Sequence, residues 1–136
     1  MNKKNTILFI DDEKICHTLV ELIIPNFTEF NLVNAYNGEE AVHLAHRYAS
    51  SLVLILSDIM LPDFSGYEIY KTLKKDDRFK NIPFIFQSGL DSQEEELKKH
   101  ISEPCTILYK PYKQADLLDA IETALNEVTK PNDKQQ

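Results

Sequence analysis

The stretch Leu52-Val53-Leu54-Ile55-Leu56-Ser57-Asp58 places five apolar residues in a row and ends on a hydroxyl and a carboxylate. A strand that is apolar at consecutive positions has both faces covered, which is typical of a parallel sheet between two layers of helices. The stretch therefore predicts an internal strand of a three-layer α/β protein, with Asp58 at the carboxyl end of that strand.

Four further short apolar runs lie on either side of this stretch, and each is about as long as a strand. Segments with apolar residues three or four positions apart separate the runs and predict helices. Because right-handed crossovers connect such units, the sequence predicts a doubly wound α/β sandwich of five strand–helix units. The four runs are residues 7–10, 30–33, 82–86 and 105–109.

The first helical segment carries an apolar stripe of Ile15, Leu19, Leu22 and Ile23, which we expect to face the core. Pro25 is predicted to end this helix. Ser92 and Glu95 have the spacing of a capping box, which predicts the start of a charged helix. The other helices are expected after residues 37–40, around residues 67–74, from Ser92 to about Ser102, and from Leu117 to a point before Pro131.

Composition restricts the possible partners and compartments. The 136 residues carry 15 Lys and Arg against 22 Asp and Glu, a net charge of −7, which argues against direct binding of nucleic acid. No apolar run is long enough to span a membrane, and residues 1–5 are too short for a signal peptide core, so a cytoplasmic protein is expected.

Cys16 and Cys105 are interpreted as small buried apolar residues, and His17, His43, His46 and His100 as solvent-exposed helix residues.

Polar side chains stand where four of the predicted strands end. In a parallel sheet, ligands bind beyond the carboxyl ends of the strands. Two carboxylates about 4 Å apart repel each other by roughly 4 kcal/mol at an effective dielectric constant near 20. A divalent cation bound between them offsets this repulsion, and Mg²⁺ is the cation that prefers oxygen ligands. A metal ion, an ammonium and a hydroxyl around one carboxylate suit a transferred phosphoryl group, with Asp58 as the nucleophile. The side chains are Asp11, Asp12, Asp58, Ser88 and Lys110.

On these motifs the chain resembles the receiver domains of bacterial two-component response regulators. The resemblance extends over residues from about 5 to 128 and implies a flavodoxin-like sheet of strand order 2-1-3-4-5. It divides the chain into a receiver domain at 1–128 and a short tail at 129–136. The motifs are Ile10-Asp11-Asp12-Glu13, the stretch from Ser57 to Glu68, Gln87-Ser88-Gly89 and Tyr109-Lys110-Pro111.

The resemblance also implies a role for each site residue. Asp58 is expected to accept a phosphoryl group from a sensor histidine kinase or a histidine phosphotransfer protein. Direct Mg²⁺ ligands would be Asp12, Asp58 and the backbone carbonyl of Met60, with Asp11 acting mainly through water. Lys110 would contact the phosphoryl group and Ser88 would swing toward it. The resemblance further implies a cis peptide bond before Pro111 and kinase docking on Ile15, Cys16 and Leu19 of the first helix.

Two departures from the family pattern concern switching and lifetime. Where the family usually has an aromatic residue three positions before the lysine, this chain has Ile107, and the aromatic residue stands at Tyr109 instead. Because an isoleucine cannot make the in–out swing of a ring, the usual coupling of Ser88 to the outer surface is in question. Met60 and Leu90 offer no group to orient an attacking water, which predicts a long-lived phosphoryl group.

Three alternatives stand beside a single-domain receiver that signals by docking to a downstream protein. A phosphatase with an Asp nucleophile needs a general acid two residues further on, where this chain has Glu13 after Asp11 and Met60 after Asp58. We therefore expect no enzyme beyond self-phosphorylation and autodephosphorylation. A flavin- or nucleotide-binding module needs a phosphate loop after the first strand, where Asp11 and Asp12 would repel phosphate. A receiver cut from a larger transcriptional or enzymatic regulator remains open.

Overall fold

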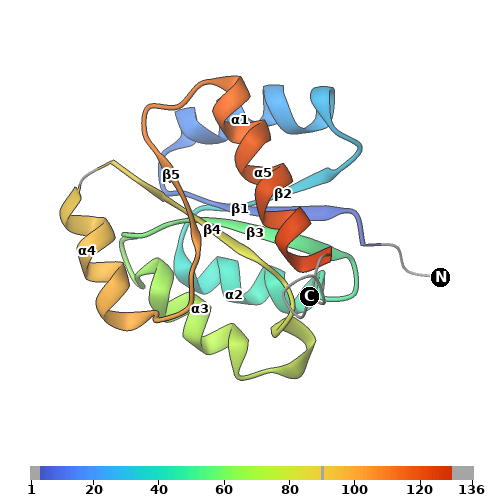
Figure 1. Cartoon of the computed structure of the whole chain (residues 1–136). Coiled ribbons are helices and arrows are strands. Elements are labelled where there is room, and N and C mark those ends of the chain that lie inside the picture. Colours follow the sequence, from blue (N-terminus) through green and yellow to red (C-terminus); the bar gives the residue numbers. More distant parts are fainter. Residues whose placement is uncertain (1–3, 90, 130–136) are drawn as a thin grey trace, which may run out of the picture.

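The computed structural model describes residues 4–89 and 91–129, and it shows one parallel sheet between two layers of helices (Figure 1). The strand order is β2-β1-β3-β4-β5, which confirms the predicted doubly wound fold and its order 2-1-3-4-5. Every neighbouring pair of strands is parallel. The strands are β1 (Thr6–Ile10), β2 (Asn31–Ala35), β3 (Leu52–Asp58), β4 (Phe84–Ser88) and β5 (Thr106–Tyr109).

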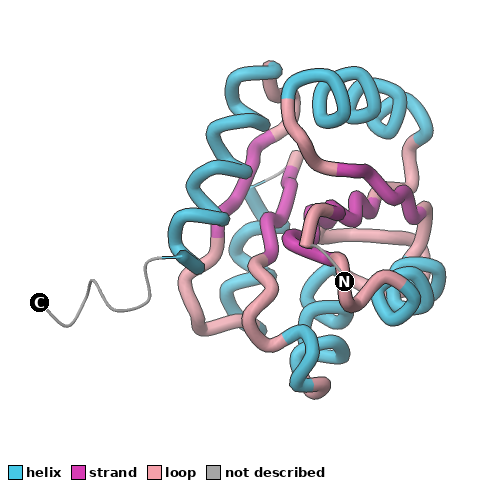
Figure 2. The backbone as a smooth tube through the Cα atoms, turned by 90° about the vertical axis from the view of Figure 1, so that its right-hand side faces the viewer, coloured by secondary structure: helices cyan, strands magenta, loops and turns pink. Residues whose placement is uncertain are grey.

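In the described part of the chain, five α-helices cover the two faces of the sheet. Helices α1 and α5 contribute to the core on one face, and α2, α3 and α4 to the core on the other (Figures 1 and 2). Within the described part of the chain, no helix is both long and apolar enough to cross a membrane. The helices are α1 (Lys14–Phe27), α2 (Gly38–Arg47), α3 (Gly66–Lys74), α4 (Asp91–His100) and α5 (Gln114–Thr129), with a short 3₁₀ helix η1 (Asp77–Phe79).

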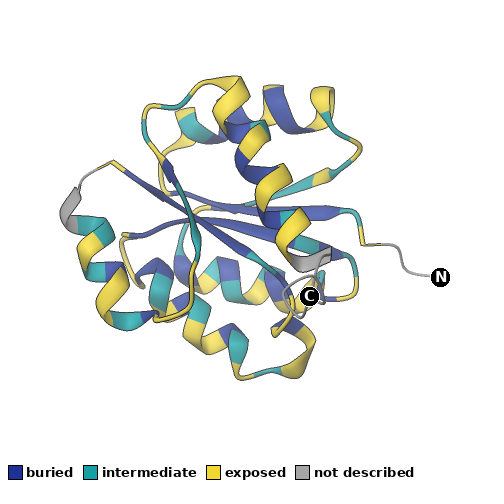
Figure 3. Ribbon diagram, in the orientation of Figure 1, coloured by how far each residue is buried: buried dark blue, intermediate teal, exposed yellow. Residues whose placement is uncertain are grey.

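The central strands explain the run of consecutive apolar residues. Along β1, Ile7 and Phe9 belong to the core on the α1–α5 side, whereas Leu8 and Ile10 belong to the core on the α2–α4 side. All five residues of β1 are buried, as are all but one of the seven residues of β3 (Figure 3). Successive side chains of a strand point to opposite faces, so both sets must be apolar when helices cover both faces.

The predicted inner face of α1 is wrong for three of its four residues. Ile15, Leu19 and Leu22 are exposed, at 76%, 44% and 60% of their surface, and only Ile23 of the predicted stripe is buried. The buried face also contains His17, Val20 and Ile24. Because apolar residues occur on both sides of this helix, the three-to-four spacing fits either face, and the periodicity alone selects the wrong one.

Pro25 does not end α1, contrary to the prediction, because the helix continues to Phe27. A proline lacks one backbone donor, and near the end of a helix few hydrogen bonds remain to be disturbed. Side chains add donors there, since Asn26 donates to the carbonyl of Leu22 at 2.9 Å and the Thr28 hydroxyl donates to the carbonyl of Ile24 at 2.6 Å. The backbone N–H of Thr28 also donates to Ile24, so the helical hydrogen-bond pattern continues past the proline.

Candidate functional site

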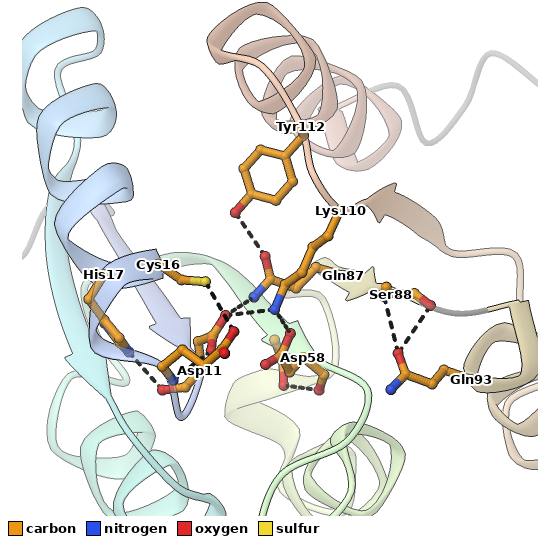
Figure 4. A network of polar contacts seen from close by, with 12 residues as sticks. Asp11, Cys16, His17, Asp58, Gln87, Ser88, Gln93, Lys110 and Tyr112 are labelled. Atoms are coloured by element: carbon orange, nitrogen blue, oxygen red, sulfur yellow. Dashed lines mark hydrogen bonds and ion pairs between the residues drawn. The ribbon is translucent and has the colours of Figure 1, made fainter.

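Four of the five polar residues predicted at the strand ends, Asp11, Asp12, Asp58 and Lys110, lie together in one pocket, whereas Ser88 lies to one side and contacts Gln93 (Figure 4). Lys110 follows β5, and its ammonium lies 2.9 Å from Oδ1 of Asp58, the last residue of β3. The same ammonium lies 3.1 Å from Oδ2 of Asp11, which follows β1. Ligand oxygens of Asp11, Asp12 and Asp58 all lie within 4.8 Å of one another. The pocket therefore joins three carboxylates and one cation from three strands.

Burial controls the charge of Asp58, which is only 7% exposed. Burial and the neighbouring charge of Asp11 raise the pKa of Asp58 from 3.8 to about 7, against the opposing effect of Lys110. Burial on its own would lower the pKa of Lys110, but the charges of Asp58 and Asp11 raise that pKa above its ordinary value. Asp58 is thus the carboxyl whose ionisation the pocket opposes, and a cation bound there would favour it.

The Asp11 carboxylate is fully buried and accepts three hydrogen bonds. The backbone N–H of Glu13 donates to Oδ1 at 2.8 Å. The side-chain amide of Gln87 donates to Oδ2 at 2.6 Å, and the ammonium of Lys110 donates to the same oxygen. Asp12, in contrast, is exposed. The sequence predicted that both residues belong to the site, and the structure gives them different environments.

The turn after Asp58 depends on a glycine. The backbone N–H of Gly66 donates to the carbonyl of Ile59 at 2.6 Å, and a Cβ atom at position 66 would overlap the backbone oxygen of Asp58. Ser65 begins α3 as its N-cap and forms a capping box with Glu68. Ser65 therefore fixes where α3 begins after the turn.

Asp63 attaches the loop between β3 and α3 to the start of α2. Its two carboxylate oxygens accept the backbone N–H groups of Gly38 at 2.7 Å and Glu39 at 2.9 Å. Although slight burial acts to raise the pKa of Asp63, hydrogen bonds from backbone N–H groups lower it below its ordinary value. The loop that contains Met60, whose carbonyl is a predicted metal ligand, is therefore anchored at its far side.

The predicted switch residues contact α4. The Ser88 hydroxyl and the backbone N–H of Gly89 both donate to Oε1 of Gln93, each at 3.2 Å. The exposed Tyr109 donates its hydroxyl to Oε1 of Glu94, and Ile107 is half-buried in β5. The Lys110–Pro111 peptide is cis, as predicted. Leu90 lies outside the described residues, and so do the side chain of Ser92 and most of the predicted tail.

Sequence reasoning missed His17, which was predicted to be exposed and is 1% exposed. Its Nε2 lies 2.7 Å from the backbone oxygen of Asp11, and its Nδ1 lies 2.6 Å from Oδ1 of Asn34. The ring also contacts Phe9 and Tyr36. The prediction failed because α1 turns position 17 toward the sheet, on the same face as Val20 and Ile24. The other three histidines are exposed or partly exposed.

Gln87 and Tyr112 were also missed, although one of them left a signal in the sequence. Gln87 is a single amide between the apolar residues of β4 and Ser88, and it is fully buried. Tyr112 follows the cis proline and donates its hydroxyl to Oε1 of Gln87 at 2.8 Å.

Cys16 and Cys105 are partly buried rather than buried. Burial is the main cause that raises the pKa of Cys16 to about 12, which makes its thiol a poor nucleophile.

Comparison with known proteins agrees with this geometry. A family model for the response regulator receiver domain matches residues 7–122. The chain is 31% identical over 121 residues to the probable transcriptional regulator ycf29 of Porphyra purpurea, covering 89% of this chain and 56% of that protein. It is 28% identical over 109 residues to the polar-differentiation response regulator DivK of Brucella anthropi, covering 75% of this chain and 86% of DivK.

A solved structure shows the same fold. The receiver domain of the sensor histidine kinase PA1611 from Pseudomonas aeruginosa, with a magnesium ion in its active site cleft, superposes with a TM-score of 0.79 at 22% identity. The match covers 90% of this chain and 98% of that domain. The chain spans about half the length of the first curated relatives that it matches, at 40%, 56% and 49%.

Fold and pocket together define a doubly wound α/β domain with a cluster of carboxylates and a lysine at the carboxyl edge of its sheet. With the family match over residues 7–122, the chain belongs to the receiver domains of two-component response regulators.

Proposed function

We propose that this receiver domain accepts a phosphoryl group on Asp58 from a sensor histidine kinase or a histidine phosphotransfer protein, with Mg²⁺ bound beside it. The observation that carries the proposal is the buried Asp58 carboxylate, held 2.9 Å from the Lys110 ammonium in a pocket with two further carboxylates. This set provides a nucleophile, a fixed positive charge and oxygen ligands at one place.

The donor set fits a magnesium ion. Carboxylate oxygens of Asp11, Asp12 and Asp58 converge, and Mg²⁺ prefers oxygen ligands and keeps several waters. Asp12 is exposed enough to bind the ion directly, whereas Asp11 is buried and largely occupied by its own hydrogen bonds. When bound, the ion supplies charge that neutralises the phosphoryl oxygens. The magnesium ion in the related PA1611 receiver supports this assignment.

The residues of this chain then divide the transfer among them. A carboxylate oxygen of Asp58 attacks the phosphorus, a P–O bond forms, and the P–N bond to the donor histidine breaks, so that the imidazole leaves. Lys110 places its ammonium where the incoming phosphoryl oxygens gain negative charge. Ser88 turns its hydroxyl toward the phosphoryl group, which requires it to release Gln93.

Helix α1 offers the surface for the phosphoryl donor. Ile15, Leu19 and Leu22 project from α1 with 76%, 44% and 60% of their surfaces exposed, and Cys16 between them is partly buried. Residues three and four positions apart on a helix lie on one face, so the three apolar side chains form a stripe. The stripe fits a helical partner next to the β1–α1 loop, where Asp11 and Asp12 lie.

The relatives and the turn after Asp58 bear on two further questions, whether the receiver is part of a larger regulator and whether it turns over a substrate. Two relatives named as probable transcriptional regulators are longer than this chain, which favours a receiver that belongs to, or descends from, a larger regulator as the second candidate. Met60 stands where an Asp-dependent phosphatase would need its general acid. We therefore infer a switch that signals by docking to a downstream protein, with no substrate turnover beyond its own phosphorylation and dephosphorylation.

Labelling by a small phosphodonor tests the proposal. The wild-type chain is incubated with acetyl phosphate and Mg²⁺, and the intact mass is measured before and after the acyl phosphate is cleaved with hydroxylamine. We expect one phosphoryl group in the wild type and none in Asp58→Asn. Asp119→Asn, an exposed carboxyl on α5, is the matched control and should label normally. Labelling that persists in Asp58→Asn and disappears in Asp11→Asn would instead indicate a phosphatase-like nucleophile.

A further inference from the structure

Gln87 is a fully buried amide in the middle of the sheet, in register with Asp58 on the neighbouring strand. A buried amide without partners would cost several kcal/mol. Both ends of this one are bonded, because Nε2 donates to Asp11 Oδ2 at 2.6 Å and Oε1 accepts the Tyr112 hydroxyl at 2.8 Å (Figure 4). The glutamine thus connects the pocket to the start of the β5–α5 loop.

Asp11 and Tyr112 together fix which way the amide points. A phenol hydroxyl that donates must meet the oxygen of the amide, which turns the NH₂ group toward Asp11. Burial is the main cause that raises the pKa of Tyr112 above its ordinary value, so the phenol keeps its proton and remains a donor. Because the ionised Asp11 carboxylate can only accept, the NH₂ group of Gln87 faces Asp11 and Oε1 is left for the Tyr112 hydroxyl, so a flip of the amide would lose the bond to Asp11.

The three donors limit what Asp11 can offer to a cation. A carboxylate has about four lone-pair directions, two on each oxygen. Gln87 and Lys110 occupy both directions of Oδ2, and the backbone N–H of Glu13 occupies one of Oδ1. What remains for a metal ion, or for a water bound to it, is the open side of Oδ1, and the Cys16 thiol, which also interacts with Asp11, narrows the choice further.

We propose that Gln87 and Tyr112 are positioning residues of the phosphorylation site, which hold the Asp11 carboxylate so that the open side of Oδ1 faces the metal position. The inference rests on the proposed function, since it presumes Mg²⁺ in this pocket. Without the amide, Oδ2 of Asp11 would keep Lys110 as its only donor from these side chains. The Lys110 ammonium is shared between Asp11 and Asp58. Loss of the Gln87 amide would therefore draw this ammonium toward Asp11 and leave Asp58 less well paired.

Magnesium affinity of three variants tests the inference. Gln87→Leu, Tyr112→Phe and the double variant are titrated with Mg²⁺, followed by NMR chemical shifts of backbone amides around the pocket. Groups that orient metal ligands change affinity by about 10–100-fold when removed. We expect about a tenfold loss for Gln87→Leu and a smaller loss for Tyr112→Phe. The double variant should be no weaker than Gln87→Leu, because Tyr112 acts through Gln87.

The controls separate positioning from stability and from the proposed function. Tyr48→Phe removes a hydroxyl at the end of α2, beside the start of β3 and so at the far edge of the sheet, and should leave the affinity unchanged. In the metal-free wild type, the side-chain NH₂ of Gln87 should exchange slowly with solvent, and this protection should fall in Tyr112→Phe. If Gln87→Leu does not fold, Tyr112→Phe gives the same test with a smaller change in volume.

Two results would overturn the inference. The first leaves the proposed function standing, and the second removes it as well. If wild type binds Mg²⁺ and labels on Asp58 while both single variants bind Mg²⁺ equally well, the positioning role is wrong and the receiver function remains. If wild type neither binds Mg²⁺ nor labels on Asp58, the proposed function fails and the inference fails with it.

Discussion

Replacement of Asp58 by asparagine should stabilise the metal-free protein at alkaline pH. The substitution keeps the shape of the side chain but removes a carboxyl that the pocket opposes ionising. The pKa of Asp58 rises on folding from 3.8 to about 7, with burial as its main cause. The folded state therefore binds a proton that the unfolded state has lost between these values, and stability falls as pH rises through that range.

The size of the effect follows from the shift. A rise of about 3 pKa units at 1.36 kcal/mol per unit corresponds to roughly 4 kcal/mol in total. The stabilisation from the retained proton is fully present below a pH of about 4 and is lost by a pH of about 8. Between about pH 5 and pH 8, wild type should thus lose roughly 3 kcal/mol relative to Asp58→Asn. The amide of the variant has no proton to lose, so its stability curve lacks this contribution.

Urea unfolding of both proteins at several pH values, with a chelator present, measures the difference. The quantity of interest is how the gap in free energy of unfolding changes with pH, because a constant gap can arise from packing alone. Adding Mg²⁺ at alkaline pH should narrow the gap, since the cation binds the ionised form of wild type. Asp119→Asn should run parallel to wild type throughout. Parallel curves for wild type and Asp58→Asn would show that folding does not raise the pKa of Asp58, and our account of the pocket's charge would be wrong.

Three further predictions concern metal, backbone and lifetime. Because a proton and Mg²⁺ compete for Asp58, Mg²⁺ affinity should be about tenfold weaker near pH 6 than near pH 8, and a calorimetric or NMR titration that finds equal affinity would contradict this. Gly66→Ala should destabilise the fold by about 1–3 kcal/mol in urea unfolding, because the new Cβ would overlap the Asp58 carbonyl; an unchanged midpoint would show that the turn relaxes. The phosphoryl group on Asp58 should persist in purified, kinase-free wild type and be lost faster in Met60→Glu, and rapid loss from wild type would rule out the long lifetime.

The sequence was informative where one physical cause dominates. Two-sided burial forces β3 to be apolar from Leu52 to Leu56, so the fold could be predicted from that stretch and its neighbours. Charged residues at strand ends converge whatever the details of packing, which placed Asp11, Asp58 and Lys110 in one pocket. The inner face of α1 could not be predicted in this way. Ile15 and Val20 are equally apolar, and only the path of the chain onto the sheet decides which is buried.

Gln87 shows a second kind of limit. A single amide in an apolar strand signals that something polar lies nearby, but its partners are 76 and 25 residues away in the chain. The register of the sheet pairs Gln87 with Asp58. The direction in which the Gln87 side chain points from that position decides which oxygen it contacts. Spacing along the sequence contains no information about such a contact, so the pocket's supporting hydrogen bonds become visible only in the folded chain.

The contacts of α4 bear on how a chain with Ile107 could still transmit a signal. Ser88 and Gly89 share one acceptor, Oε1 of Gln93, at the start of α4. If Ser88 turns to the phosphoryl group, this acceptor keeps the Gly89 N–H and loses the hydroxyl, so the change reaches α4 without a ring in the core. The exposed Tyr109 remains tied to Glu94 one residue further along. A small shift of the first described turn of α4 can therefore begin when the Ser88–Gln93 hydrogen bond breaks, which an isoleucine at position 107 does not prevent.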